Sequence, residues 1–120
     1  MPNYRRMSVV KRDDTDFELT FEDIDGNPIN LTGATVFFTV KVNKTDAEDD
    51  AVLKKEITEF EDPTSGIALL QLSKTETDLI PKSYYFDIQL VDSTGKVAST
   101  YAGRFLVDQD ITIRTEEEIS

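Results

Sequence analysis

Hydrophobic and polar residues alternate over several short stretches of this chain. In residues 17–21 the apolar side chains of Phe17, Leu19 and Phe21 are separated by single polar residues. A period of two is typical of a β-strand with one face buried and the other in water. The pattern recurs, more weakly in places, and the further segments that we predict as strands are 36–42, 52–60, 67–72, 84–90, 96–107 and 111–113.

Turn-forming residues separate these segments. Glycine, proline, asparagine, aspartate and serine cluster at 25–28, 62–66 and 92–95, and each cluster predicts a chain reversal. Ser73 and Glu76 match the helix-capping box, in which the serine side chain accepts a hydrogen bond from the amide three residues on. No segment has the spacing of apolar residues that would predict a long helix.

Short strands without a long helix predict an all-β fold. We expect an antiparallel immunoglobulin-like β-sandwich of about seven strands, with a small barrel as the alternative. Segment 67–72 is apolar on both faces, which predicts a central strand covered on both sides. In segment 36–42, Phe37 lies on the otherwise polar face, as a lone exposed side chain or as one that a neighbouring chain covers.

The length of 120 residues fits one domain of ordinary size. Charge is distributed unevenly along it, with basic residues at the start and acidic residues over most of the remainder. We therefore predict a basic N-terminal arm at 1–12, a β-sandwich domain at 13–114 and an acidic C-terminal tail at 115–120.

The basic arm has two interpretations. Its charged residues are Arg5, Arg6, Lys11 and Arg12, with no acidic residue among the first twelve. The arm is either a solvated terminus or a segment that docks on the acidic surface of a neighbouring subunit. These four residues, together with Phe37, are our candidates for contact with a partner.

The whole chain is strongly acidic, with a formal net charge of -11 and a sequence pI of about 4.3. This charge opposes the phosphate backbone of nucleic acids and the anionic surface of a membrane, so we expect neither as a partner. The sequence also shows no apolar run typical of a secretory signal and none long enough to span a membrane.

Histidine and cysteine are both absent. Their absence excludes the Ser-His-Asp and Cys-His catalytic arrangements and zinc sites built from these ligands. Paired carboxylates are too frequent in so acidic a chain to indicate a glycosidase. We predict that the protein is not an enzyme and that it carries no cofactor and no metal.

Two acidic clusters leave calcium as an alternative. Residues 23–27 resemble the start of a calcium loop, but Pro28 stands where an EF-hand loop has its glycine, and Ala34 stands at the closing carboxylate position. Turn propensity alone explains this cluster. Residues 46–50 form the second cluster, for which a solvated loop is the simpler explanation.

The order of motifs resembles a known family. The sequence DGNPINLTGATVFF at 25–38, a glycine-led strand at Gly66, TDLIPKSYYFDIQL at 77–90 and YAGRFLVDQDIT at 101–112 follow one another. In this order they resemble the N-terminal immunoglobulin-like β-sandwich module of the phage baseplate upper protein family. Where those modules often have Pro-Gly, this chain has Pro81 followed by Lys82.

The resemblance implies a structural role in a virus particle. The expected function is that of a non-enzymatic assembly component of a bacteriophage virion, in its tail or baseplate, built in the cytoplasm of the host bacterium. Its expected partners are other virion proteins and further copies of itself. The rival hypothesis is an immunoglobulin-like adhesin or carbohydrate-binding module that acts through its loops, with calcium at residues 46–50.

Overall fold

The computed structural model describes residues 6–43, 45 and 50–109. Seven strands lie in these residues: β1 (Arg6–Val10), β2 (Thr15–Thr20), β3 (Thr35–Lys41), β4 (Leu53–Ile57), β5 (Ile67–Leu72), β6 (Lys82–Val91) and β7 (Val97–Asp108). A short 3-10 turn, η2 (Pro63–Ser65), lies between β4 and β5. The prediction of an all-β fold is confirmed for the described residues.

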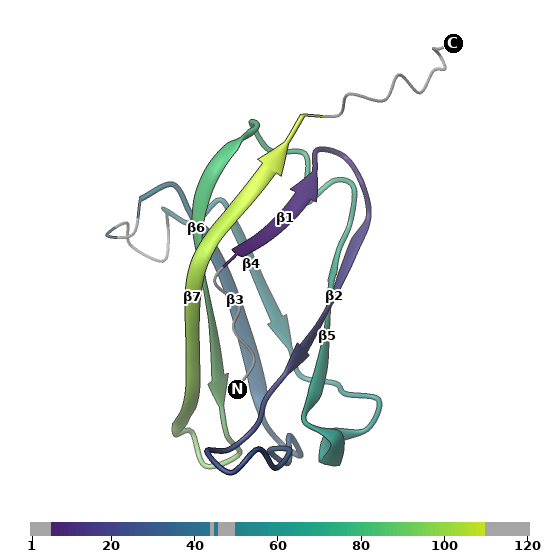
Figure 1. The fold of residues 1–120 in the computed structure, drawn as a ribbon, viewed down its shortest axis with the longest axis vertical. Coiled ribbons are helices and arrows are strands. Elements are labelled where there is room, and N and C mark those ends of the chain that lie inside the picture. Colours follow the sequence, from purple (N-terminus) through teal and green to yellow (C-terminus); the bar gives the residue numbers. More distant parts are fainter. Residues whose placement is uncertain (1–5, 44, 46–49, 110–120) are drawn as a thin grey trace.

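The strands form two sheets (Figure 1). The larger sheet has five strands in the order β1-β7-β6-β3-β4, and the smaller one consists of β2 and β5. Hairpin-like antiparallel pairing joins β3 to β4 and β6 to β7, and β3 also pairs antiparallel with β6. The larger sheet therefore has β6 at its centre and β1 and β4 at its edges.

One pairing departs from the predicted antiparallel arrangement. β1 runs parallel to β7, with Arg6 opposite Arg104. Alternation within β1 turns Met7 and Val9 into the core, where each is 3% exposed, and this burial explains why the segment forms a strand of the sheet. Residues 6–10 of the predicted basic arm therefore belong to the folded domain, and the boundary predicted at residue 13 lies too far along the chain. The predicted strand at 111–113 lies outside the described residues.

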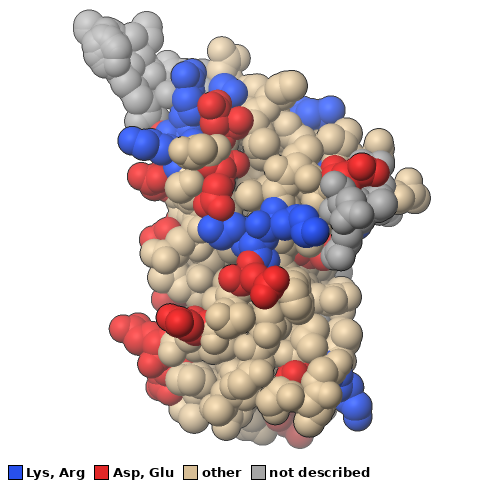
Figure 2. All heavy atoms as spheres, turned by 180° about the vertical axis from the view of Figure 1, so that it is seen from behind, with Lys and Arg blue, Asp and Glu red and all other residues tan. Residues whose placement is uncertain are grey.

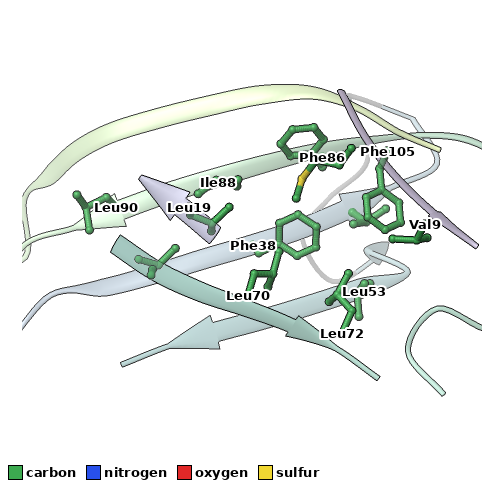
Figure 3. Close-up of a cluster of buried hydrophobic side chains, with 14 of the residues drawn as sticks. Val9, Leu19, Phe38, Leu53, Leu70, Leu72, Phe86, Ile88, Leu90 and Phe105 are labelled. Atoms are coloured by element: carbon green, nitrogen blue, oxygen red, sulfur yellow. The ribbon is translucent and has the colours of Figure 1, made fainter. Parts of the chain in front are cut away.

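The hydrophobic core lies between the two sheets. Figure 3 shows side chains of β3, β6 and β7 pointing toward those of β2 and β5. Phe38 of β3 is at the middle of this core, with ring centroids 6.0 Å from Phe86 and 5.9 Å from Phe105. Leu19 of β2 and Leu70 of β5 are completely buried across from it. Burial of each such side chain contributes about 1.5–3 kcal/mol, so the alternation that forms the strands also assembles the domain.

The strand at 67–72 differs from its prediction. Its inner residues Ala68, Leu70 and Leu72 are buried as expected, but Ile67 is 36% exposed and Leu69 is 46% exposed. β5 lies in a sheet of two strands, and the outer face of this strand is only partly covered by the described residues. The prediction of a central strand covered on both sides was therefore wrong for the described residues.

Candidate interaction surface

A groove of about 710 Å³ lies beside β5. One wall is the outer face of β2 and β5, and the other is the end of β4 with the segment that connects it to η2. We call it the β5 groove; its main lining residues are Glu18, Ile57, Glu59, Phe60, Ile67 and Leu69.

The floor of the β5 groove is apolar. Alternation in β5 places Ile67 and Leu69 on its outer face, and both are exposed. Ile57 at the end of β4 and Phe60 just after it are only half-buried. Four large apolar side chains therefore line one hollow in the surface, and apolar clusters of this kind are typical of contact sites on otherwise polar proteins.

Strand edges border this groove. Among the described residues β5 pairs only with β2, and β4 pairs only with β3. Each strand therefore has a second edge whose backbone amides and carbonyls are not engaged by another described strand. Such edges are templates for pairing with a further strand.

The rim of the groove is acidic. Its carboxylates come from β2, β4 and the connecting segment, and they are Glu18, Glu56, Glu59, Glu61 and Asp62. Figure 2 views the molecule from behind, so the β4–β5 connection lies at its lower left, where acidic side chains gather. Because carboxylates surround an apolar floor, the groove favours a partner with basic and apolar side chains.

The short turn η2 holds the acidic segment beside β5. The Asp62 carboxylate accepts hydrogen bonds from the Thr64 amide at 3.2 Å and the Thr64 hydroxyl at 2.8 Å. Gly66 then ends the turn with a φ of 74° and donates its amide to the Pro63 carbonyl oxygen. The segment thus projects from a fixed turn.

An ion pair fastens β4 to the β5–β6 connection at the groove. Lys55 Nζ lies 2.8 Å from a carboxylate oxygen of Glu76. The predicted capping box is confirmed, because the Ser73 hydroxyl accepts from the Glu76 amide at 3.2 Å and the Ser73 amide donates to the Glu76 carboxylate at 2.9 Å. Desolvation would raise the pKa of Glu76, but the hydrogen bonds from Lys55 and Ser73 hold it below its usual value.

The predicted partner-binding residues do not form one site. Lys11 turns back onto its own chain, where its Nζ lies 2.8 Å from the Asp78 carboxylate and 3.2 Å from the Leu79 carbonyl oxygen. Arg12 is exposed at a backbone position with a φ of 69°. Arg5 lies outside the described residues.

The other two predicted residues lie on the outer face of the five-stranded sheet. Arg6 is exposed there at the start of β1, opposite Arg104 of β7. Arg104 in turn lies over the Tyr85 ring, with its guanidinium carbon 4.4 Å from the ring centroid. Phe37 is half-buried on β3, beside Gln89 of β6. Arg6 therefore lies in a basic area with Arg104. The apolar residues that line the β5 groove were not among the predicted partner-binding residues.

The first acidic cluster that suggested calcium is a hydrogen-bonded turn. The Asp23 carboxylate accepts from the amides of Asp25 and Asn27, both at 2.9 Å. Asp92 makes the same arrangement at the β6–β7 reversal, accepting from the amides of Thr94 at 2.9 Å and Lys96 at 3.0 Å. In the described part of the chain no three acidic side chains are grouped as a metal site would require. Residues 46–49 of the second cluster lie outside it.

These turns predict a loss of stability in acid. Hydrogen bonds lower the pKa of both carboxyls. The largest cause at Asp92 is the bond from the Thr94 hydroxyl, and the largest cause at Asp23 is the bond from the Asn27 amide. A lowered pKa in the folded state gives stability that is present above about pH 4 and is lost as the pH falls through the folded-state value.

We therefore expect Asp92→Asn to lower the melting temperature at pH 7, and the difference from the unsubstituted chain to shrink toward pH 3. Thermal unfolding followed by circular dichroism at several pH values measures this. Asp50→Asn, at an exposed residue outside both turns, is the control. A difference at Asp92 that stays constant with pH would show that the charge has no part in the turn.

Comparison with known proteins adds no assignment: no family model matches the chain, and no curated protein matches it. Within the described residues, no helix has the length and apolar character needed to cross a membrane.

Proposed function

We propose that this chain is a non-enzymatic immunoglobulin-like module that acts by binding other proteins in a large assembly, as a part of a bacteriophage tail or baseplate. The observation that carries the proposal is the β5 groove, an apolar floor with an acidic rim and open strand edges. A surface of this kind binds protein segments, and the chain contains no histidine or cysteine with which to build the common catalytic sites.

The strand order supports the immunoglobulin-like part of the proposal. In such domains the third, sixth and seventh strands of the seven form one sheet, and variable-type domains add a further strand after the third. Here β3, β6 and β7 lie together, β4 extends that sheet beyond β3, and β2 pairs with β5 in the opposing sheet. The parallel β1 adds to the same sheet beside β7.

A buried tyrosine supports it further. In immunoglobulin-like domains a tyrosine near the start of the sixth strand donates its hydroxyl to the backbone a few residues upstream. Tyr84, near the start of β6, donates its hydroxyl to the Ile80 carbonyl oxygen at 2.6 Å. Two residues later, where antibody domains have a disulfide cysteine, this chain has Phe86, which packs against Phe38 of β3. An aromatic side chain thus occupies this core position in place of a cysteine.

The role in a virion rests on the family resemblance. The motifs at 25–38, 77–90 and 101–112 carry that resemblance, and they correspond to the turn before β3 with most of that strand, to β6 and to the end of β7. The strongly acidic charge is consistent with a part that contacts proteins and not packaged nucleic acid.

Mass spectrometry of purified particles tests this role. We expect peptides of this chain in tailed particles purified from the organism that encodes it, in more than one copy per particle. An abundant cytosolic protein serves as the control for carry-over. Detection of the chain only in the soluble fraction, together with binding on a glycan array, would instead support the adhesin or carbohydrate-binding hypothesis.

A further inference from the structure

We infer that the β5 groove accepts the basic N-terminal segment, residues 1–5, of a second copy of this chain as an added strand. This inference rests on the assembly role proposed above and names the surface and the partner through which copies associate.

The backbone of the groove is suited to an extended segment. β5 is paired on one side only among the described residues, and its free edge runs along the groove. A segment that adds to this edge makes main-chain hydrogen bonds along the strand, and pockets beside the edge select its side chains. The small sheet would then have three strands, a number at which sheets become considerably more stable than isolated pairs.

The exposed side chains of β5 are suited to the same occupant. Ile67 and Leu69 point away from the core and are 36% and 46% exposed, in a strand whose composition is typical of one covered on both faces. In an extended segment Pro2 and Tyr4 lie on one face and Met1 lies on the other, so the Tyr4 ring, beside Pro2, can cover them. Burial of two such side chains contributes about 1.5–3 kcal/mol each when complete.

The charge of the groove favours the N-terminal segment over the β5 strand of another copy as its occupant. Two β5 edges paired across a two-fold axis would bring the acidic rims together, including Glu59 and Glu61, and like charges at an interface oppose association. The N-terminal segment has no acidic residue and brings Arg5, followed directly by the exposed Arg6. Opposite charges therefore meet when the segment enters the groove.

Geometry favours a second copy over the chain's own segment. Residues 1–5 lead into β1, at one edge of the five-stranded sheet, whereas the groove adjoins β4, at the other edge. Five extended residues span about 17 Å, less than the length of β5, so the chain's own segment cannot both reach the groove and lie along the strand. In a second copy it can lie along β5, whose six residues extend about 20 Å.

Light scattering on charge-reversed variants tests the inference. We expect the full chain to show a mass that is a multiple of its 13.6 kDa at low salt and to dissociate as salt screens the charges. Removing residues 1–5, or replacing Glu59 and Glu61 by lysine, should weaken self-association about tenfold or more. A chain that carries both Arg5→Glu with Arg6→Glu and Glu59→Lys with Glu61→Lys should associate again, because the charges are exchanged.

The truncation must stop before β1. Removing the first twelve residues would also remove Met7 and Val9 from the core. The domain would then lose stability, and a loss of association could not be assigned to the N-terminal segment. The control reversal is Asp25→Lys with Asp50→Lys, two exposed residues that do not line the groove; it should leave association unchanged.

A second measurement does not depend on the charge-reversed variants. A synthetic peptide of residues 1–6, titrated into the chain that lacks residues 1–5, should shift the amide signals of β5 in nuclear magnetic resonance spectra. A full chain that stays monomeric at its highest soluble concentration, or a peptide that leaves the β5 signals unmoved, overturns the inference. Neither result bears on whether the chain is found in particles, so the proposed virion role is judged separately.

Discussion

Gly66→Ala is expected to destabilise the domain by about 2–5 kcal/mol, through backbone strain and overpacking together. Gly66 has a φ of 74°, a conformation that costs an alanine free energy at any site. Its added Cβ would also lie 2.6 Å from the Phe21 carbonyl oxygen and 3.1 Å from the Ile29 amide nitrogen, both of them backbone atoms. Urea unfolding followed by circular dichroism measures the loss.

Gly26→Ala is the matched control for this substitution. Gly26 has a φ of 86°, but a Cβ built there meets no atom within 4 Å. Only the conformational cost of about 1–2 kcal/mol should appear. The difference between the two variants then measures the close approach of three backbone segments where the η2 turn enters β5. Equal losses at both glycines would contradict that approach.

Phe38→Ala is expected to cost about 3–5 kcal/mol, which is a large part of the about 5–15 kcal/mol that stabilises an ordinary domain. Phe38 is completely buried and lies against the rings of Phe86 and Phe105, so its removal leaves a cavity at the centre of the core. The midpoint of urea unfolding should fall accordingly. The milder Phe38→Leu keeps the core filled better and should cost less, which gives a measurable value if the alanine variant does not fold.

Phe37→Ala is the control one residue away. Phe37 lies on the opposite face of the same strand and is half-buried, so its loss should cost about 1 kcal/mol or less. A loss at Phe37 as large as that at Phe38 would mean that the outer face of β3 is also covered, which would support the hypothesis that a neighbouring chain contacts it.

The strands whose two faces differ were predictable from the sequence. In β6 the inward Tyr84, Phe86 and Ile88 alternate with more polar residues, and the period of two fixes both the secondary structure and the buried face. The turns at 25–28 and 92–95 were predictable for a similar reason, because aspartate and glycine satisfy local geometry that does not depend on the rest of the fold.

β1 was missed although its pattern was present. Met7 and Val9 are separated by a single polar residue, as in the other strands, but the surrounding arginines and lysine suggested a solvated arm. Net charge describes how a segment meets water and distant charges, whereas burial depends on the face that each side chain occupies. In β1 the charged Arg6 lies on the exposed face and the apolar Met7 on the buried face, so a basic segment can also be a core strand.

The β5 groove was beyond sequence reasoning for a different reason. The alternation in 67–72 correctly indicates two apolar faces, but it does not say which chain covers the second one. The groove forms because the segment after β4 projects past β5, and that placement depends on contacts between residues of β2, β4 and β5 that are distant in the sequence. No short-range pattern encodes such an arrangement.

The parallel pairing of β1 with β7 has a consequence for how the domain folds. β1 can pair with β7 only after β7 has left the ribosome. Met7 and Val9 therefore cannot be buried in the core until synthesis of the domain is complete. Domains dominated by such non-local pairings fold slowly, over about milliseconds to seconds. The β3–β4 and β6–β7 pairs join strands that are neighbours in the sequence and can form earlier. Docking of β1 is therefore expected to be the last step, the one that closes the core.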